Sequence, residues 1–141
     1  NLAGLLSLLE KEERLPKTIL YTLNQKNNYV LATIAACFQQ EGVPGRVQLG
    51  PAWWFNDNRD GILCQLKDFA NAGVLATFVG MLTDSRCYIS YPRHEYFRRI
   101  FCDLLGGWVE QGEFTSDPQV LKTLVEAVCY RNALRYFNAP S

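Results

Sequence analysis

The sequence lacks any apolar run close to the roughly 20 residues that a membrane helix needs. Its first residues, NLAGLLSLLEKEERLP, lack the basic region and cleavage pattern of a secretory signal. It also has no excess of either charge, because fourteen Lys and Arg residues balance fourteen Asp and Glu residues. This balance argues against attraction to nucleic acid or to an anionic membrane. We therefore expect a soluble, cytoplasmic protein that binds neither.

The cysteines lack the spacings of a zinc site, and no C-x-x-C pair occurs. Their number, five, is odd, so reduced thiols are the simplest prediction. A neighbouring cation lowers a thiol pKa, so Cys87 beside Arg86 could be more reactive than the others. The other four lie in apolar helical patterns and are predicted to be small buried side chains: Cys37, Cys64, Cys102 and Cys129.

Several catalytic motifs are also missing. No glycine-rich loop matches a P-loop or a dinucleotide fingerprint, and no G-x-S-x-G occurs. The only histidine, His94, begins the segment HEYFR, where Arg98 occupies the position at which a zinc-protease motif has its second histidine. We therefore expect His94 to make local hydrogen bonds in the first turn of a helix. Arg93, Arg98 and Arg99 are expected to form a solvated or ion-paired face.

What the sequence does contain is enough apolar residues for a core. Of its 141 residues 48% are hydrophobic and 20% are charged, which predicts one globular unit over residues 1–141. The segment LAGLLSLLEKEE has a helical pattern from residue 2, and no capping signal precedes it. We therefore expect a fragment or a processed product of a longer protein.

Three predicted strands recur at intervals of about 30 residues, and each is followed by a helical pattern. The strands are KTILYTL from Lys17, RVQLGPAWWF from Arg46 and TFVGMLTD from Thr77. Strand followed by helix at this period is typical of βαβ units in a parallel sheet. The helical patterns cover residues 30–38, 62–70 and 92–108.

The end of the chain is predicted to be helical. Gly106 and Gly107 are expected to loosen or end the helix that opens at Pro92. Asp117 and Pro118 form a favourable N-cap and N1 pair for a last helix that continues to Leu134.

Two architectures fit three parallel strands with flanking helices. One is a small doubly wound sheet, and the other is three consecutive units of an eight-stranded barrel, which needs about 250 residues in all. In both, sites form at the carboxyl ends of the strands. A polar cluster follows each predicted strand there, at residues 24–28, 56–59 and 84–86.

The residues after the third predicted strand are candidates for chemistry. If strand geometry continues to Arg86, then Asp84 and Arg86 leave the chain on the same face. An aspartate there can bind a metal, and an arginine can hold a carboxylate or stabilise an enolate oxygen. A structural ion pair or a capping turn explains the pattern equally well.

Two adjacent tryptophans, Trp53 and Trp54, end the second predicted strand. Alternation would point one toward the helix layer, as a core residue, and the other toward the opposite face. An exposed indole there could form one wall of a ligand pocket, since rigid ligands pack well on its ring. Core packing of both is the simpler interpretation.

Taken together, four segments resemble the C-terminal part of bacterial uronate isomerase (glucuronate isomerase), in the amidohydrolase superfamily. They are LPKTILYTLN, VQLGPAWWFNDNRDGILCQL, FVGMLTDSR and SYPRHEYFRRIFCDLLGGWVEQGE, within a resemblance that runs from Leu15 to Phe137. The resemblance implies an α/β fold that forms the C-terminal part of a (β/α)8 TIM barrel. It also implies isomerisation of D-glucuronate to D-fructuronate and of D-galacturonate to D-tagaturonate.

The resemblance also assigns roles to residues. Asp84 is similar to an aspartate that binds a divalent metal, expected to be zinc, and takes part in catalysis. Arg86 is similar to an arginine that is catalytic and binds substrate, and Trp53 and Trp54 are similar to substrate-binding residues. The family's H-x-H metal motif does not occur in this sequence. We therefore expect the chain alone to be inactive, with a hexuronate substrate and a homo-oligomeric state for the complete enzyme. The alternative is a non-catalytic binding or self-association module derived from the barrel.

Overall fold

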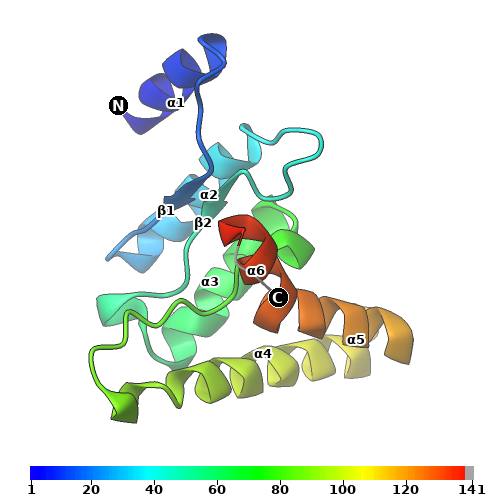
Figure 1. Ribbon diagram of the computed structural model, residues 1–141. Helices are drawn as coiled ribbons and strands as arrows, with labels where there is room; N and C mark the ends of the chain where they lie inside the picture. Colours follow the sequence, from blue (N-terminus) through cyan, green and yellow to red (C-terminus); the bar gives the residue numbers. More distant parts are fainter. Residues whose placement is uncertain (139–141) are drawn as a thin grey trace.

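The computed structural model describes residues 1–138, in which a small sheet lies beside α2 at one side of a mostly helical chain (Figure 1). The α-helices are α1 (Leu2–Lys11), α2 (Asn28–Ala36), α3 (Arg59–Ala72), α4 (Arg93–Glu110), α5 (Pro118–Glu126) and α6 (Asn132–Phe137). The strands are β1 (Thr18–Leu20) and β2 (Val47–Leu49). Short 3-10 turns are η1 (Gln25–Asn27), η2 (Trp54–Asn56), η3 (Leu75–Thr77) and η4 (Tyr88–Ser90), and η5 (Ala127–Arg131) is π-helical.

The two strands confirm the predicted parallel unit. β1 pairs with β2 in parallel, with Thr18 opposite Val47 and Leu20 opposite Leu49, and α2 forms the crossover. Parallel neighbours require a crossover of this kind. α2 packs against both β2 and α3, and α3 packs against α4 (Figure 1). The α/β prediction is therefore confirmed for this part of the chain.

The third predicted strand is wrong, because no strand forms after residue 49 in the described part of the chain. Phe78 and Val79 are buried as expected, but side chains bind their backbone groups in place of a ladder. The Val79 N–H donates to Gln48 Oε1 at 2.9 Å, and the carbonyl of Phe78 accepts from Asn132 Nδ2 at 2.8 Å. Gly80, with φ of +74°, then takes the backbone away from extended geometry.

Two helix ends differ from prediction, and one confirms it. Asn1 does cap α1, since its side-chain oxygen accepts from the Gly4 N–H at 3.4 Å. α4 continues past Gly106 to Glu110, because burial of its apolar face outweighs a glycine cost of about 1 kcal/mol. Asp117 caps α5 as predicted, accepting from the Gln119 N–H at 2.8 Å.

The core has a main cluster and a smaller one. The main cluster joins β2, α3, the extended segment 78–81, α4 and the end of the chain, with Leu49, Leu66, Phe78 and Phe101 almost fully buried. The smaller cluster packs α1 against β1 and α2. Among the described residues no helix combines the length and apolar character needed to cross a membrane. The predicted single unit includes residues 139–141, which lie outside the described part.

Candidate functional site

Asp84 and Arg86 lie on a turn at the end of the buried extended segment. Asp84 has a φ of +49°, so the predicted strand geometry does not reach Arg86. The two side chains nevertheless approach each other, with Arg86 Nη2 4.0 Å from Asp84 Oδ2. The Arg86 side chain is 87% exposed and the Asp84 side chain is 62% exposed, so this ion pair contributes little to stability, about 0–1 kcal/mol. Because the two opposite charges are exposed and contribute little to stability, both side chains are accessible to a ligand.

The neighbouring hydroxyls stiffen the same turn. Ser85 Oγ donates to Thr83 Oγ1 at 2.6 Å, directly beside Asp84. Thr83 itself is buried, so the turn is anchored at its first residue and exposed at its charged residues.

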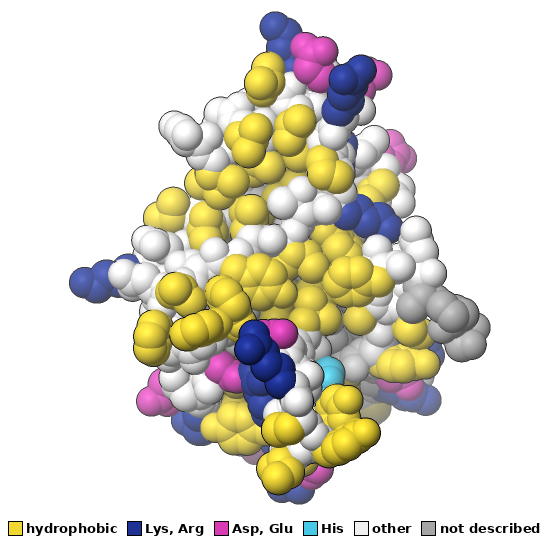
Figure 2. Space-filling view, turned by 60° about the vertical axis from the view of Figure 1, so that its left-hand side comes forward, with side chains coloured by type: hydrophobic (Ala, Val, Ile, Leu, Met, Phe, Trp, Pro, Cys, Tyr) yellow, Lys and Arg dark blue, Asp and Glu magenta, His cyan; other side chains and the backbone are white. Residues whose placement is uncertain are grey.

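Figure 2 shows a face on which hydrophobic side chains gather next to acidic and basic side chains and the single histidine.

The two tryptophans line the surface and do not enter the core. Trp54 is 62% exposed and Trp53 is half-buried, so the prediction that one or both belong to the core is wrong. The reason is that the chain leaves extended geometry there, with a φ of +52° at Trp54. The two indoles meet edge to face, with ring centroids 5.7 Å apart. Both remain available as pocket walls.

Tyr21 belongs to the same surface, although the sequence did not single it out. Its ring lies edge-on to Trp53 with centroids 5.6 Å apart. Burial and the nearby Asp84 carboxylate raise the pKa of the Tyr21 hydroxyl above its usual range. Tyr21 thus connects the aromatic residues with the Asp84 turn. Tyr21 could have been predicted as a site residue from its position directly after β1, because Trp53 was predicted from its position at the end of the second strand.

The loops that follow β1 and β2 are in contact. Asn56 is buried and donates from Nδ2 to the carbonyl of Thr22 at 3.0 Å. Asn58 caps α3, accepting from the Gly61 N–H at 2.9 Å. Asn28 is fully buried, and neither its amide nitrogen nor its oxygen has a hydrogen-bond partner within residues 1–138. The prediction that strand ends gather polar groups at one edge is confirmed for these two loops.

Two members of the basic trio, Arg93 and Arg99, have different environments, and Arg98 is exposed. Arg99 pairs with Glu95 on the exposed face of α4, with nitrogen and oxygen 2.7 Å apart. Arg93 instead bonds to the Asp57 carboxylate and to the carbonyl of Thr83. The sequence predicted a solvated or ion-paired face, which fits Arg98 and Arg99, but it did not predict that Arg93 links two loops.

His94 lies in the first turn of α4, as predicted, with its backbone N–H donating to Tyr91 at 3.1 Å. Burial and the neighbouring Arg98 and Arg93 lower the pKa of its imidazole below 6.5. A neutral imidazole could bind a metal, so the surrounding ligands matter. Within residues 1–138 no group of three or more His, Cys, Asp or Glu side chains could hold a metal ion. Asp84 supplies one carboxylate, and these residues do not make a metal site by themselves.

The cysteines are all free thiols in the described part of the chain. The prediction that four of them are buried is wrong for Cys37 and Cys102, which are exposed, while Cys64 and Cys129 are half-buried. Cys37 is the C-cap residue that follows α2, and Cys102 lies on the exposed side of α4. Cys87 is exposed too. Helical periodicity alone therefore predicted burial for Cys37 and Cys102, whereas both are exposed.

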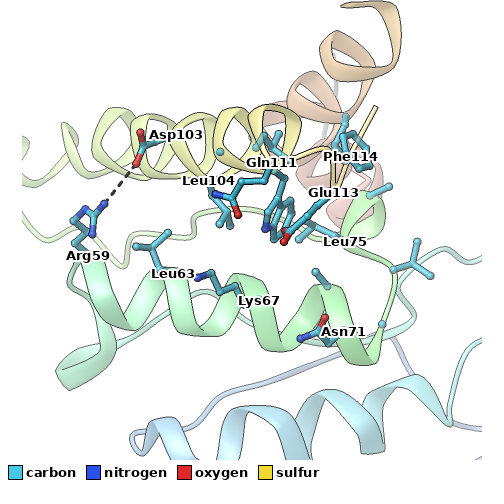
Figure 3. Close-up of a pocket in the computed structure, with 18 residues that line it drawn as sticks. Arg59, Leu63, Lys67, Asn71, Leu75, Asp103, Leu104, Gln111, Glu113 and Phe114 are labelled. Carbon is cyan, nitrogen blue, oxygen red and sulfur yellow. Dashed lines mark ion pairs between the residues drawn. The ribbon is translucent and has the colours of Figure 1, made fainter. Parts of the chain in front are cut away.

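A separate hollow lies between α3 and α4 (Figure 3). Its volume is about 910 Å³, and Leu63, Lys67 and Leu104 contribute to its walls. At one end Arg59 pairs with Asp103, with nitrogen and oxygen 3.5 Å apart. None of the four predicted site residues lines it. The predicted site residues therefore point to the turn at Asp84 and Arg86, and not to this groove in the helix layer.

Comparisons with known proteins agree with each other. A family model described as glucuronate isomerase matches residues 1–137. The chain is 60% identical over 136 residues to a uronate isomerase of Caldicellulosiruptor saccharolyticus, covering 96% of this chain and 29% of that protein. It is 53% identical over 133 residues to a uronate isomerase of Bacillus subtilis, covering 94% of this chain and 28% of that protein.

A solved structure is similar as well. The crystal structure of uronate isomerase from Thermotoga maritima superposes with a TM-score of 0.81 at 32% sequence identity. The match covers 95% of this chain and 28% of that chain. The present chain thus spans about 29% of the length of the curated relatives that it matches.

Proposed function

The chain belongs to the glucuronate isomerase family, and from this premise we propose that it forms the C-terminal part of a (β/α)8 barrel in a hexuronate isomerase. The parallel β1-α2-β2 unit supports this proposal, because barrels are built from such units. The segment 78–83 would be the next strand. It would gain its ladder from a strand that the described residues do not provide.

The proposed reaction interconverts D-glucuronate and D-fructuronate, and D-galacturonate and D-tagaturonate. An aldose–ketose isomerisation moves a proton between adjacent carbons through an enediolate, whose developing charge needs a preorganised cation. The observation that carries the proposal is the exposed Asp84–Arg86 pair, 4.0 Å apart, on a strand-end turn. We propose that Asp84 takes part in the proton transfer and that Arg86 binds the substrate and offsets the negative charge.

The aromatic residues would shape the pocket. Trp53, Trp54 and Tyr21 offer ring faces and edges next to the turn, on which a sugar ring could pack. A divalent metal, zinc in our proposal, would act as a Lewis acid when bound. Asp84 would be one of its ligands, and the others would have to come from outside this chain. We therefore propose that the chain alone is inactive.

The test uses a uronate isomerase that carries this chain. Asp84→Asn and Arg86→Gln should each lower kcat/KM for D-glucuronate by about 100-fold or more, as loss of a transition-state charge partner does. Their unfolding midpoints should stay unchanged, because both side chains are exposed. Asp103→Asn and Arg59→Gln remove another exposed ion pair, in the helix layer, and should leave turnover unchanged. Equal activity in all four variants would contradict the assignment.

The second candidate is a non-catalytic binding or self-association module. Its motivation is the lack of a three-ligand metal cluster among residues 1–138 and the strong exposure of Tyr88 and Ile89, at 87% and 89%. Light scattering of the chain alone, with uronate binding measured with and without zinc, separates the two candidates. A monomer that binds a uronate tightly without metal favours the module. A homo-oligomeric enzyme is the expectation of the first candidate.

A further inference from the structure

Arg93 makes contacts that its position on the helix does not explain. It is the first residue of α4 and follows the N-cap Pro92. A cation at a helix N-terminus meets the positive end of the helix dipole, so the location is electrostatically unfavourable. The guanidinium reaches off the helix to two acceptors: the Asp57 carboxylate and the backbone carbonyl of Thr83, 2.5 Å from Nη1.

The two acceptors belong to two different strand-end loops. Asp57 follows the turn η2 that carries Trp54, and Thr83 immediately precedes Asp84. The Arg93 and Asp57 side chains are 31% and 17% exposed, so water competes with their contact only in part. An arginine presents several donors in one plane and can serve two acceptors at once, whereas a lysine is a point donor. One guanidinium thus joins α4 to both loops.

The contact with Thr83 fixes a particular peptide group. The carbonyl that accepts from Arg93 belongs to the peptide that links Thr83 to Asp84. Holding that oxygen restricts the rotation of the whole peptide plane, and so sets the direction in which Asp84 leaves the chain. Asp84 needs such support, because its φ of +49° is unfavourable for a residue with a side chain. The buried anchor at Thr83 and the strained Asp84 are adjacent.

We propose that Arg93 is a positioning residue, which together with Asp57 holds the Thr83–Asp84 peptide so that Asp84 and Arg86 are presented to the substrate. This inference rests on the proposed function of the same turn. Arg93 itself need not touch the substrate. Arg93 holds the turn through the backbone carbonyl of Thr83, and it holds the loop that carries Trp54 through Asp57.

The test compares Arg93→Gln, Arg93→Lys and Asp57→Asn in a uronate isomerase that carries this chain. Arg93→Gln and Asp57→Asn should lower kcat by about 10–100-fold, with a smaller change in KM, as loss of a supporting partner does. Arg93→Lys should recover part of the loss. Arg99→Gln is the matched control: it removes the same charge from the same helix, where only Glu95 is bonded, and should change neither constant. An equal, small effect of Arg93→Gln and Arg99→Gln would overturn the proposal.

The double variant Asp57→Asn, Arg93→Gln tests whether the two residues act together. If they hold one turn, the double variant should lose no more kcat than the worse single variant, because the contact is already broken. Losses that multiply would overturn the joint role. A purely structural role would lower the folded fraction and leave kcat per folded enzyme unchanged, which would also contradict the proposal.

A second readout does not depend on turnover. Arg86 is exposed, so trypsin can cut after it once the turn loosens. Cleavage between Arg86 and Cys87, followed by mass spectrometry, should be faster in Arg93→Gln than in wild type or Arg99→Gln. If the wild type shows no uronate isomerisation, the proposed function fails. The positioning of the turn is then still judged by trypsin, and equal cleavage rates would overturn it.

Discussion

Gln48, fully buried in β2, accepts a hydrogen bond from the backbone N–H of Val79 at 2.9 Å through its side-chain oxygen. Its amide nitrogen donates to the carbonyl of Gly45, also at 2.9 Å. A single side chain therefore ties the segment 78–83 to the sheet where a third strand was expected. Its oxygen takes the place of one ladder bond, and the bond from its amide nitrogen to Gly45 holds the side chain in position.

Gln48→Leu should lower the free energy of unfolding by about 2–4 kcal/mol. The substitution roughly keeps the side-chain volume but leaves a buried N–H and a buried carbonyl without partners, each of which costs about 1–3 kcal/mol. Urea denaturation measures the change. Gln119→Leu, on the exposed side of α5, is the control and should stay within about 0.5 kcal/mol of wild type. Equal stability of both variants would show that Gln48 does not anchor the segment.

Gly80→Ala should be severely destabilising, by more than about 3 kcal/mol. Gly80 has a φ of +74°, and an added Cβ would lie 2.1 Å from the carbonyl oxygen of Val128. Gly106→Ala is the matched substitution, because a Cβ there meets nothing within 4 Å inside α4. It should stabilise the protein by about 0.4–1 kcal/mol. Thermal unfolding of the two variants measures both effects. A mild effect of Gly80→Ala would contradict the close approach of the Val128 carbonyl, in η5, to Gly80.

His94 should titrate below 6.5, and Arg98→Gln should raise its pKa because burial and then Arg98 are the main causes of the shift. The only histidine of the chain is directly assignable by NMR titration. Arg99→Gln, one residue further, should leave the pKa where it is. An unchanged pKa in Arg98→Gln would refute this electrostatic cause.

The same shift predicts a pH dependence of stability. When the folded pKa is lowered, the unfolded chain binds the proton first as the pH falls. His94 therefore contributes stability that is present above pH 6.5 and is lost below it. His94→Gln should weaken this part of the acid dependence in urea denaturation. A steeper dependence in that variant would contradict the sign.

Tyr136 should make stability fall in alkali. Burial raises the pKa of its hydroxyl from 10.0 to about 12. The unfolded chain then loses the proton first, so this contribution is complete below about pH 10 and disappears as the pH rises toward 12. Tyr136→Phe should remove that slope, and should also cost about 1 kcal/mol at neutral pH through the lost bond to the Arg46 carbonyl. The exposed Tyr130→Phe is the control, and an identical alkaline slope in both would contradict the prediction.

The local features of the fold were the most predictable from sequence. The apolar periodicity of α2, α3 and α4 and the Asp117–Pro118 start of α5 depend on neighbouring residues, and the structure confirms them. The third strand was not predictable in this way. A strand needs a partner, and in its place the side chains of Gln48 and Asn132, distant in sequence, bind the backbone of segment 78–83.

For the candidate site, too, some features could be predicted from the sequence and others depend on the tertiary structure. The sequence by itself predicted Asp84, Arg86, Trp53 and Trp54 as site residues, because position along the chain and family resemblance can both be read from the order of residues. Only the tertiary structure decided that both indoles are on the surface and that Tyr21 adjoins Asp84.

The role of Arg93 also had to come from the tertiary structure. In the sequence it is one of three arginines at the start of a helix, and nothing distinguishes it from Arg99. Its partners, Asp57 and the Thr83 carbonyl, lie 36 and 10 residues away and meet it only after the chain folds. The sequence determined which residues bear charge, and the packing of α4 against the strand-end loops decided which of those charges hold the turn.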